Sequence, residues 1–384
     1  MMERWVRMQA YLDNSATTPL CKEAKQWMLR AMETDWGNPS SLHEKGFAAE
    51  TLREQARKAV ADALRCDPRC LTFTSGGTEA NNLAVFGAAA AQKRKGSRVV
   101  VSAVEHPSVL QACKELSALG FDVVMLETDR FGVVPVSALE NAIDSRTILV
   151  TMMHVNNELG AIEPIEAVPA ILKRKGAPAL FHVDAVQSFG KLPVFPEKIG
   201  ADLLTVSSHK IHGPKGAGAL YVRRGVHLVP RVFGGEQENR LRPGTEPMIA
   251  IAGFGGAASV LQNGKELARI TALRDQFTEK LRSLGEAVVL NSGAEGSPYI
   301  INLSLPGRPS EVVLNFLSDL GICVSAGSAC AKGHRSPVLA AAGISAERQN
   351  SALRISLSDQ TTAAEMDFCF EGLCEAVRVI RNKL

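Results

Sequence analysis

Short apolar runs alternate with longer helical patterns through more than half of this chain. The apolar runs have the composition of buried strands, and segments of about 10 to 20 residues with helical periodicity separate them. Such an alternation predicts an α/β fold: a largely parallel seven-stranded sheet that helices cover. The predicted strands are Cys70–Thr74, Arg98–Val101, Asp122–Leu126, Thr147–His154, Ala179–Asp184, Leu203–Ser207 and Gly218–Val222. The predicted helices between them are Glu44–Arg65, Glu79–Lys95, Ser108–Leu119 and Ile165–Lys175.

The pattern changes near residue 258, where a charged amphipathic helix begins. At about 150 residues per domain, 384 residues correspond to two or three domains. We expect two: a large domain over 15–257 and a smaller α+β domain formed by 1–14 and 258–384. The elements predicted for the smaller domain are the helix Lys265–Glu286, the strand Tyr299–Leu305, the helix Glu311–Gly321, the strand Leu353–Ser358 and the helix Thr362–Arg381. The last helix opens on Thr-Thr-x-x-Glu, which resembles a capping box.

Charge and cysteine content exclude several classes of protein. The formal net charge is +3, from 43 basic and 40 acidic residues interspersed along the chain, so neither a nucleic-acid surface nor a membrane surface is indicated. The 8 cysteines have irregular spacings without a CxxC pair, which argues against a disulfide scaffold and a zinc site. The chain shows no signal-peptide pattern and no apolar segment of about 20 residues. We therefore expect a soluble, cytoplasmic protein with reduced thiols.

Polar residues close three of the predicted strands, where ligands of open parallel sheets bind. The first group follows Thr74, where Gly76 and Gly77 lead through Thr78 into a helix. Free backbone N–H groups at this helix start, with the Thr78 hydroxyl, form a phosphate-sized anion site. An ordinary glycine turn with a threonine N-cap fits the same residues equally well. This glycine turn is not a Walker loop, because the chain has no GxxxxGK[ST] pattern.

The second and third groups are centred on Asp184 and Lys210. Asp184 ends a buried strand, where a carboxylate is costly unless it meets a cation, although an N-cap aspartate is an alternative. Lys210 follows another buried strand, and a partly buried lysine with a lowered pKa can form a Schiff base with an aldehyde. The alternative is a solvated lysine in a Gly/Pro loop. The neighbouring His209 and His212 lack a third ligand, so no metal site is expected.

Together, the phosphate site, the strand-end aspartate and the strand-end lysine are what pyridoxal 5′-phosphate requires. The aspartate keeps the pyridine nitrogen protonated, which makes the ring an electron sink. His106 also closes a predicted strand and is placed to stack on the ring.

Cys330 is the candidate nucleophile. It lies among small residues and glycines in Val324–His334, which predicts an exposed loop, and Lys332 and His334 flank it. An exposed thiol beside such groups is prone to exist as a reactive thiolate, although a small residue in a flexible loop is the alternative. Cys323 is predicted to be a core strand residue, and the other six cysteines are assigned to structure.

In their order along nearly the whole chain, the motifs resemble those of NifS/IscS-like cysteine desulfurases, which belong to the class V aminotransferases among the fold type I pyridoxal-phosphate enzymes. The matching stretches are Tyr11–Thr18, Gly37–His43, Ser75–Asn82, Glu105–His106, Val155–Gly160, His182–Ser188, Ser208–Lys215, Arg242–Thr245, Ser325–Cys330 and Arg354–Ser356. The resemblance implies the α/β fold with a smaller domain and pyridoxal 5′-phosphate as cofactor.

The resemblance also implies a role for each matched site residue. Lys210 holds the cofactor covalently and shuttles protons, and His106 stacks on the ring and assists acid–base steps. Asp184 pairs with the pyridine nitrogen, and Gln187 contacts the phenolic oxygen of the ring. The phosphate is held by Gly77, Thr78, Ser207 and His209, together with Thr245 of a partner subunit, which implies a homodimer. Arg354 binds the substrate carboxylate. Asn157 and Asn38 also face the substrate, and Asn157 contacts the cofactor as well.

Cys330 then attacks the sulfur of the substrate L-cysteine, which leaves a persulfide on the enzyme and releases L-alanine. The sulfur passes to an acceptor protein for iron–sulfur cluster assembly or tRNA thiolation. A selenocysteine lyase or a class V aminotransferase would use the same Lys210 chemistry, but transamination needs no nucleophilic thiol. The chain departs from the family pattern at Gly77, where alanine is common, at Pro243, where serine is usual, and in a short segment after Cys330.

One alternative belongs to another class of protein, the dinucleotide-binding oxidoreductases. The run Met248–Ala258 contains GxGxxA, and Asp275 lies twenty-two residues after the first of these glycines. The fingerprint needs this acidic residue at the end of a second strand, whereas Asp275 falls within a predicted helix. A Gly/Ala helix packed closely between the domains is therefore the preferred interpretation.

Overall fold

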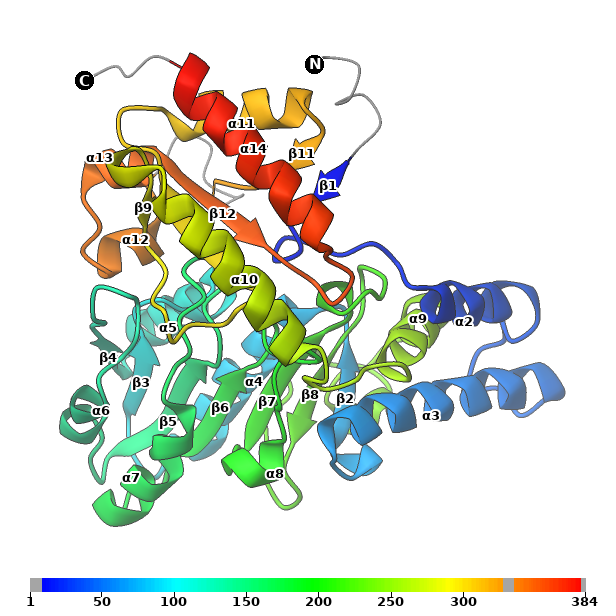
Figure 1. Ribbon diagram of the computed structural model, residues 1–384. Helices are drawn as coiled ribbons and strands as arrows, with labels where there is room; N and C mark the ends of the chain where they lie inside the picture. Colours follow the sequence, from blue (N-terminus) through cyan, green and yellow to red (C-terminus); the bar gives the residue numbers. More distant parts are fainter. Residues whose placement is uncertain (1–8, 327–334, 381–384) are drawn as a thin grey trace.

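The computed structural model describes residues 9–326 and 335–380, and its centre is a seven-stranded sheet (Figure 1). The strand order is β2-β8-β7-β6-β5-β3-β4, and β8 alone runs antiparallel to its neighbours in this sheet. The prediction of a largely parallel seven-stranded sheet is therefore confirmed. The strands are β2 (Leu71–Thr74), β3 (Arg98–Ser102), β4 (Asp122–Leu126), β5 (Thr147–Met153), β6 (Leu180–Asp184), β7 (Leu203–Ser207) and β8 (Gly218–Val222).

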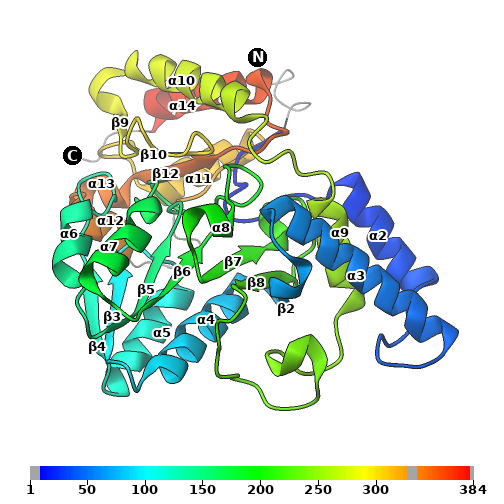
Figure 2. The same ribbon diagram turned by 90° about the horizontal axis from the view of Figure 1, so that it is seen from below.

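Helices cover both faces of the sheet, which is why its central strands are apolar throughout. Side chains alternate along a strand, so Val99 and Val101 of β3 pack toward α4 and α5 on one face. Val100 packs into the core on the opposite face, which α6, α7 and α8 cover (Figure 2). These helices are α4 (Gly77–Gln92), α5 (Pro107–Ala118), α6 (Val136–Ala142), α7 (Val168–Lys175) and α8 (Pro196–Ile199).

Strand β8 alone separates β2 from β7, the strand that precedes Lys210. At the start of β8, a Cβ on Gly218 would lie 2.7 Å from the carbonyl carbon of Gly76 and 2.9 Å from the oxygen of Val206. Only a residue without a side chain fits between these two backbones. The glycine turn after β2 and the segment after β7 therefore lie close together, separated only by Gly218 at the start of β8.

The C-terminal part forms two smaller sheets. One is the antiparallel set β12-β10-β9, and the other pairs β1 with β11 in parallel. Helix α14 opens on the predicted capping box, in which Thr362 and Glu365 bond each other's backbone N–H groups, and it packs beside α10. The strands are β1 (Ala10–Tyr11), β9 (Val289–Leu290), β10 (Ile300–Ser304), β11 (Ile322–Cys323) and β12 (Ala352–Ser356). The helices are α10 (Leu267–Arg282), α11 (Ser310–Asp319), α12 (Pro337–Ala341), α13 (Ala346–Asn350) and α14 (Ala363–Val379).

The glycine-rich run that suggested a dinucleotide-binding turn is helix α9 (Met248–Ala258). It packs against α2 (Lys22–Glu33) and α3 (Glu44–Leu64), rather than between the domains. A Cβ on Gly255 would lie 2.5 Å from Ala56 Cα, and one on Gly256 would lie 2.6 Å from the Glu23 oxygen. The glycines therefore serve close helix packing, and Asp275 lies within α10. No strand leads into this run, which removes the dinucleotide alternative.

The prediction that Cys323 is a core residue is wrong. It does lie in a strand, β11, but its side chain is exposed. Successive side chains of a strand point to opposite faces, and Ile322 takes the buried one. Among the described residues, no helix combines the length and the apolar character needed to cross a membrane.

Candidate active site

A cavity of about 320 Å³ opens where the parallel strands β5, β6 and β7 end. The edge beyond the carboxyl ends of parallel strands is where ligands of this fold class bind. Most of the predicted site residues line it: Gly77, Thr78, His106, Asn157, Asp184, Gln187, Ser207, His209, Lys210 and Arg354. Residues from segments more than 300 positions apart in the sequence therefore meet around one cavity.

Lys210 ends a short 3₁₀ turn (Ser208–Lys210) that directly follows β7. Its Nζ donates hydrogen bonds to the backbone oxygens of Ser15 and Ala16, the latter over 2.8 Å. Burial, together with the nearby cations Lys191 and Arg354, lowers the pKa of Lys210 to about 7, against the opposite effect of Asp13 and Asp184. Near neutral pH this lysine therefore holds a large fraction of neutral, nucleophilic amine.

Asp184 ends β6 and is held by a chain of hydrogen bonds. Its Oδ2 accepts from the Asn81 side-chain amide over 2.7 Å, and its Oδ1 accepts from the Val186 backbone over 3.0 Å. The same Asn81 amide donates to Ser108 Oγ over 2.9 Å, and that hydroxyl lies 2.8 Å from His106 Nδ1. A rigid carboxylate in the wall of the cavity is suited to hold a protonated ring nitrogen.

His106 is the N-cap of α5, and its protonation follows from its contacts. The Ser108 backbone N–H donates to Nδ1 over 3.1 Å, so this nitrogen carries no proton. Burial lowers the pKa of His106, and the charge on Lys210 lowers it further. The imidazole is therefore neutral near pH 7, with its proton on Nε2.

The start of α4 and the end of β7 form the anion-binding side of the cavity. Gly77 and Thr78 are the first residues of α4, where backbone N–H groups lack intrahelical partners. A Cβ on Gly77 would lie 2.9 Å from Val186, so glycine keeps this turn close to the strand ends. Ser207 Oγ is buried and has no hydrogen-bond partner among the described residues.

Gln187 and His209 flank Lys210. The Gln187 amide donates to the Ser15 oxygen over 3.1 Å, and its buried Oε1 has no partner within the described part of the chain. His209 Nδ1 lies 3.3 Å from Thr17 Oγ1. Burial and the adjacent Lys210 lower the pKa of His209 to about 4, so it is neutral at physiological pH.

Arg354, in β12, faces the cavity from the C-terminal part of the chain. Its guanidinium donates to Asp13 Oδ1 over 2.8 Å and to the Asn157 oxygen over 2.9 Å. The side chain is only 3% exposed, so its orientation is fixed by these partners. A buried guanidinium at a cavity wall is a suitable receptor for a carboxylate.

Cys330 lies outside the described residues, but the chain on both sides of it is described. Ser325 forms a backbone bridge with Arg354, and Ser336 Oγ donates to Glu158 Oε2 over 2.6 Å. Arg354 and Glu158 both line the cavity. The segment that carries Cys330 is therefore anchored at both ends beside the site.

Two predicted residues lie elsewhere in this chain. Asn38 and Thr245 are exposed and line a separate surface pocket between α2 and α9, not the cavity at the strand ends. The structure thus places both on the outside of the same subunit. From this exposed position, the side chains of Asn38 and Thr245 can contact a second protein molecule.

Sequence analysis assigned no role to Asn81, Ser108, Asp13 or Lys191. Asn81 lies in the quoted turn motif, and its spacing of four from Gly77 puts it on the inner face of α4, which was the available signal. Lys191 has no comparable signal. Its Nζ is buried without a hydrogen-bond partner among the described residues and lies 5.7 Å from the centre of the Tyr299 ring. Burial lowers the pKa of Lys191 to about 8.

These residues fit pyridoxal 5′-phosphate. The buried oxygens of Ser207 and Gln187 lack partners that a phosphate and a ring hydroxyl can supply. A lysine amine, a fixed carboxylate and a helix start surround the same cavity. Fold and site together define the class: an α/β enzyme that carries pyridoxal 5′-phosphate at the carboxyl edge of its sheet.

Comparisons with known proteins identify the family. A family model described as aminotransferase class-V matches residues 10–368. Cysteine desulfurase IscS of Dictyoglomus turgidum is 39% identical over 382 residues, which cover 98% of this chain and 96% of that protein. A solved structure of a NifS-like protein has a TM-score of 0.91 and 34% identity, covering 97% of this chain and 100% of that one. A structure of SspA in complex with cysteine has a TM-score of 0.80 and 34% identity, covering 92% and 100%.

The chain belongs to the aminotransferase class-V family and, within it, to the cysteine desulfurases of the IscS and NifS type. Enzymes of this family depend on pyridoxal 5′-phosphate, which is the cofactor that the residues of the cavity fit.

Proposed function

We propose that this protein converts L-cysteine to L-alanine and takes up the sulfur as a persulfide on Cys330. The observation that carries this proposal is the anchoring of the Cys330 segment on two cavity residues, through Ser325 to Arg354 and through Ser336 to Glu158. A class V aminotransferase has no need of a thiol at this place. The relatives named cysteine desulfurase and the neighbour solved with cysteine support the same substrate.

The roles of the residues follow from their positions. Pyridoxal 5′-phosphate, held by Lys210, Asp184 and the start of α4, supplies an electron sink for charge that develops at the substrate Cα. Arg354 binds the substrate carboxylate and orients the amino acid. Neutral Lys210 Nζ accepts the Cα proton and later returns it. His106, with its proton on Nε2, stacks on the ring and keeps that face of the cavity free of water.

Sulfur transfer is balanced without an external oxidant. The Cys330 thiolate attacks the substrate sulfur, an S–S bond forms and the Cβ–S bond breaks, with its electron pair remaining on carbon. That carbon takes up a proton, so cysteine plus thiol gives alanine plus persulfide. We propose that the persulfide sulfur then passes to an acceptor protein for iron–sulfur cluster assembly or tRNA thiolation. A reduced, cytoplasmic setting suits such a thiol.

We also propose a homodimer with two domains per subunit, over 15–257 and over 1–14 with 258–384. Exposed apolar side chains support the dimer, because Met32, Trp36 and Ile249 line the surface pocket that also contains Asn38 and Thr245. Apolar groups gathered beside polar site-type residues are typical of an interface that completes a site. Strands β2 to β8 all lie in the larger sheet, whereas β1 and β9 to β12 form the small ones, which supports the domain division.

Cys330→Ser tests the function directly. We expect this variant to lose release of sulfide from L-cysteine in the presence of a thiol reductant and to keep the visible cofactor band. Cys323→Ser is the matched control, because Cys323 is exposed and precedes the same segment. Full activity of Cys330→Ser would refute the desulfurase mechanism. Amino transfer from cysteine to a keto acid by both variants would instead identify an aminotransferase.

A further inference from the structure

Three consecutive residues before the predicted phosphate-contacting Thr245 adopt a left-handed backbone. Glu238, Asn239 and Arg240 have φ angles of 47°, 54° and 64° in a short 3₁₀ turn (Gln237–Arg240). Residues with a Cβ disfavour this region, and a run of three is rarer still. No other run of consecutive non-glycine residues with positive φ occurs in 9–326 or 335–380. Contacts outside the turn must therefore hold it in this conformation.

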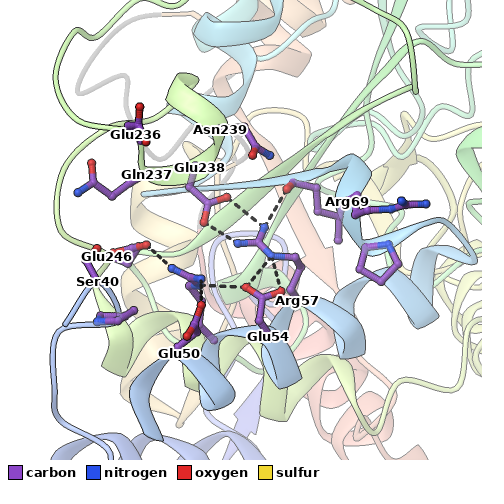
Figure 3. Close-up of a pocket in the computed structure, with 14 residues that line it drawn as sticks. Ser40, Glu50, Glu54, Arg57, Arg69, Glu236, Gln237, Glu238, Asn239 and Glu246 are labelled. Carbon is purple, nitrogen blue, oxygen red and sulfur yellow. Dashed lines mark hydrogen bonds and ion pairs between the residues drawn. The ribbon is translucent and has the colours of Figure 1, made fainter. Parts of the chain in front are cut away.

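An ion pair between Glu238 and Arg57 of α3 supplies the first contact (Figure 3). Arg57 Nη2 donates to Glu238 Oε1 over 2.7 Å, and Nη1 donates to Oε2 over 3.1 Å. Glu238 Oε2 also accepts the Phe73 backbone N–H over 2.8 Å, and Arg57 Nη1 donates to the Leu71 oxygen over 2.8 Å. The Glu238 side chain is only 2% exposed. Helix α3 and the edge strand β2 thus fix the first left-handed residue by three hydrogen bonds, and a fourth ties Arg57 itself to β2.

Two further ion pairs fix the chain that follows the turn. Arg53 Nη1, also on α3, donates to buried Glu246 Oε1 over 2.6 Å. Arg242 Nε donates to Glu79 Oε1 over 3.1 Å, and Glu79 Oε2 accepts the Ser75 N–H over 2.7 Å. Glu79 belongs to the first turn of α4, the helix whose start lines the cavity. Segment 238–246 is therefore tied both to α3 and to the phosphate-binding turn.

Fold stability alone does not account for buried pairs of this kind. Replacing a buried ion pair by apolar side chains is often neutral or stabilising, because the desolvation of both charges offsets their attraction. Buried charges are best attested where they select one arrangement over its alternatives. Here the arrangement selected is a left-handed backbone that glutamate and arginine, the residue types at 238 and 240, otherwise avoid.

We propose that Arg57 and Glu238 are positioning residues, whose ion pair holds 238–240 in the left-handed conformation and so presents Arg242 to the phosphate-binding turn and Thr245 to a second copy of this chain. The inference rests on the proposed cofactor and homodimer. The ion pair between Arg57 and Glu238 raises the affinity of the protein for the cofactor and for the partner subunit, and it does so before any substrate is bound.

Glu238→Gln tests the proposal, because it removes the charge and keeps the shape. We expect the dissociation constant for pyridoxal 5′-phosphate, measured by absorbance titration of the cofactor-free protein, to rise about tenfold, as for loss of a hydrogen bond to a charged group. We expect the dimer dissociation constant, from sedimentation, to rise as well. Arg57→Lys, which keeps the charge but loses the two-pronged geometry, should give the same shift even if Glu238→Gln fails to fold.

Glycine rescue separates positioning from a merely structural role. Glycine takes the left-handed conformation without steric cost, so Asn239→Gly with Arg240→Gly should restore most of the cofactor affinity lost in Glu238→Gln. The same glycines in the unaltered protein should change that affinity little. Asp62→Asn is the matched control, since Asp62 forms an exposed ion pair with Lys58 on the same helix α3 and does not contact the turn.

The outcomes are distinct. Unchanged cofactor affinity in Glu238→Gln and in Arg57→Lys, or loss without rescue by glycine, overturns the positioning role. If the unaltered protein binds no pyridoxal 5′-phosphate or stays monomeric at all concentrations, the proposed function itself fails.

Discussion

The side-chain amide of Asn81 donates one hydrogen bond to Asp184 Oδ2 and one to Ser108 Oγ, and so joins the carboxylate at the end of β6 to His106 at the start of α5. One buried amide therefore helps to orient two groups that line the cavity. Asn81 thus keeps Asp184 rigid and holds the Ser108 hydroxyl beside His106, whose tautomer is set by the Ser108 backbone N–H.

Asn81→Ala should weaken cofactor binding and slow the reaction. Loss of a hydrogen bond to a charged group costs about 1.5 to 3 kcal/mol, which corresponds to roughly tenfold or more in affinity. Absorbance titration with pyridoxal 5′-phosphate and steady-state alanine formation measure the two effects. Asn82→Ala is the control on the next position, where the side chain contacts only backbone oxygens. Equal behaviour of the two variants would contradict the role of Asn81.

Lys191→Met should raise the pKa of Lys210. Lys191 is a buried cation near Lys210, and like charges disfavour protonation of each other, so removing one raises the pKa of the other from about 7. At pH 7 less neutral amine remains, and capture of pyridoxal 5′-phosphate by the cofactor-free protein becomes slower. Its rate profile should move to higher pH by about half a unit or more. Lys198→Met, at an exposed position of α8, should leave the profile in place. A rate profile that moves to lower pH in Lys191→Met would contradict the conclusion that Lys191 lowers the pKa of Lys210.

Asp13→Asn should raise KM for L-cysteine. The Asp13 carboxylate accepts a hydrogen bond from Arg354 over 2.8 Å and balances its charge, so its loss misorients the guanidinium that binds the substrate carboxylate. We expect KM to increase about tenfold, the effect of roughly 1.4 kcal/mol, with cofactor content unchanged. Asp35→Asn breaks a similar aspartate–arginine pair, with Arg30 beside α2, and serves as the control. A change in kcat alone would show that Arg354 does not bind the ground-state substrate.

His182→Gln should make the protein less sensitive to acid. His182 is fully buried between Thr151 Oγ1 at 2.8 Å and Thr205 Oγ1 at 3.0 Å, and burial lowers its pKa to about 3. The unfolded chain binds a proton below about pH 6.5 and the folded protein does not, so stability is lost as pH falls from 6.5 toward 3. One such group contributes a slope of about 1.4 kcal/mol per pH unit. Urea unfolding between pH 4.5 and 7 should show a slope smaller by about this amount in His182→Gln. An unchanged slope would contradict the assignment.

Much of this arrangement follows from local sequence patterns. Strands β4, β7 and β8 have the predicted bounds, because their apolar runs end sharply at polar or glycine residues. The same pattern predicts the places of Asp184, the last residue of β6, and of Lys210, in the short turn after β7, and both line the cavity. Local pattern was sufficient wherever the strand end itself carries the functional group.

Other features depend on contacts between distant parts of the chain. Asp13 meets Arg354 across 341 positions, and no local pattern relates them. The left-handed turn at Glu238 carries residue types that favour other backbones, so only its ion pair with Arg57 explains it. Cys323 was misplaced because a two-residue strand has no periodicity from which its exposed face can be recognised.

Strand order also sets the distance between the two segments that are predicted to hold the ligand. Because β8 lies alone between β2 and β7, the phosphate turn and Lys210 start from strands two spacings apart, a span of about 9.5 Å. Bare Gly218 keeps that gap from widening at the edge where the ligand binds. An aldehyde without a phosphate arm can reach only one end of this span. We therefore expect the order of the strands to favour a phosphorylated cofactor over its unphosphorylated form.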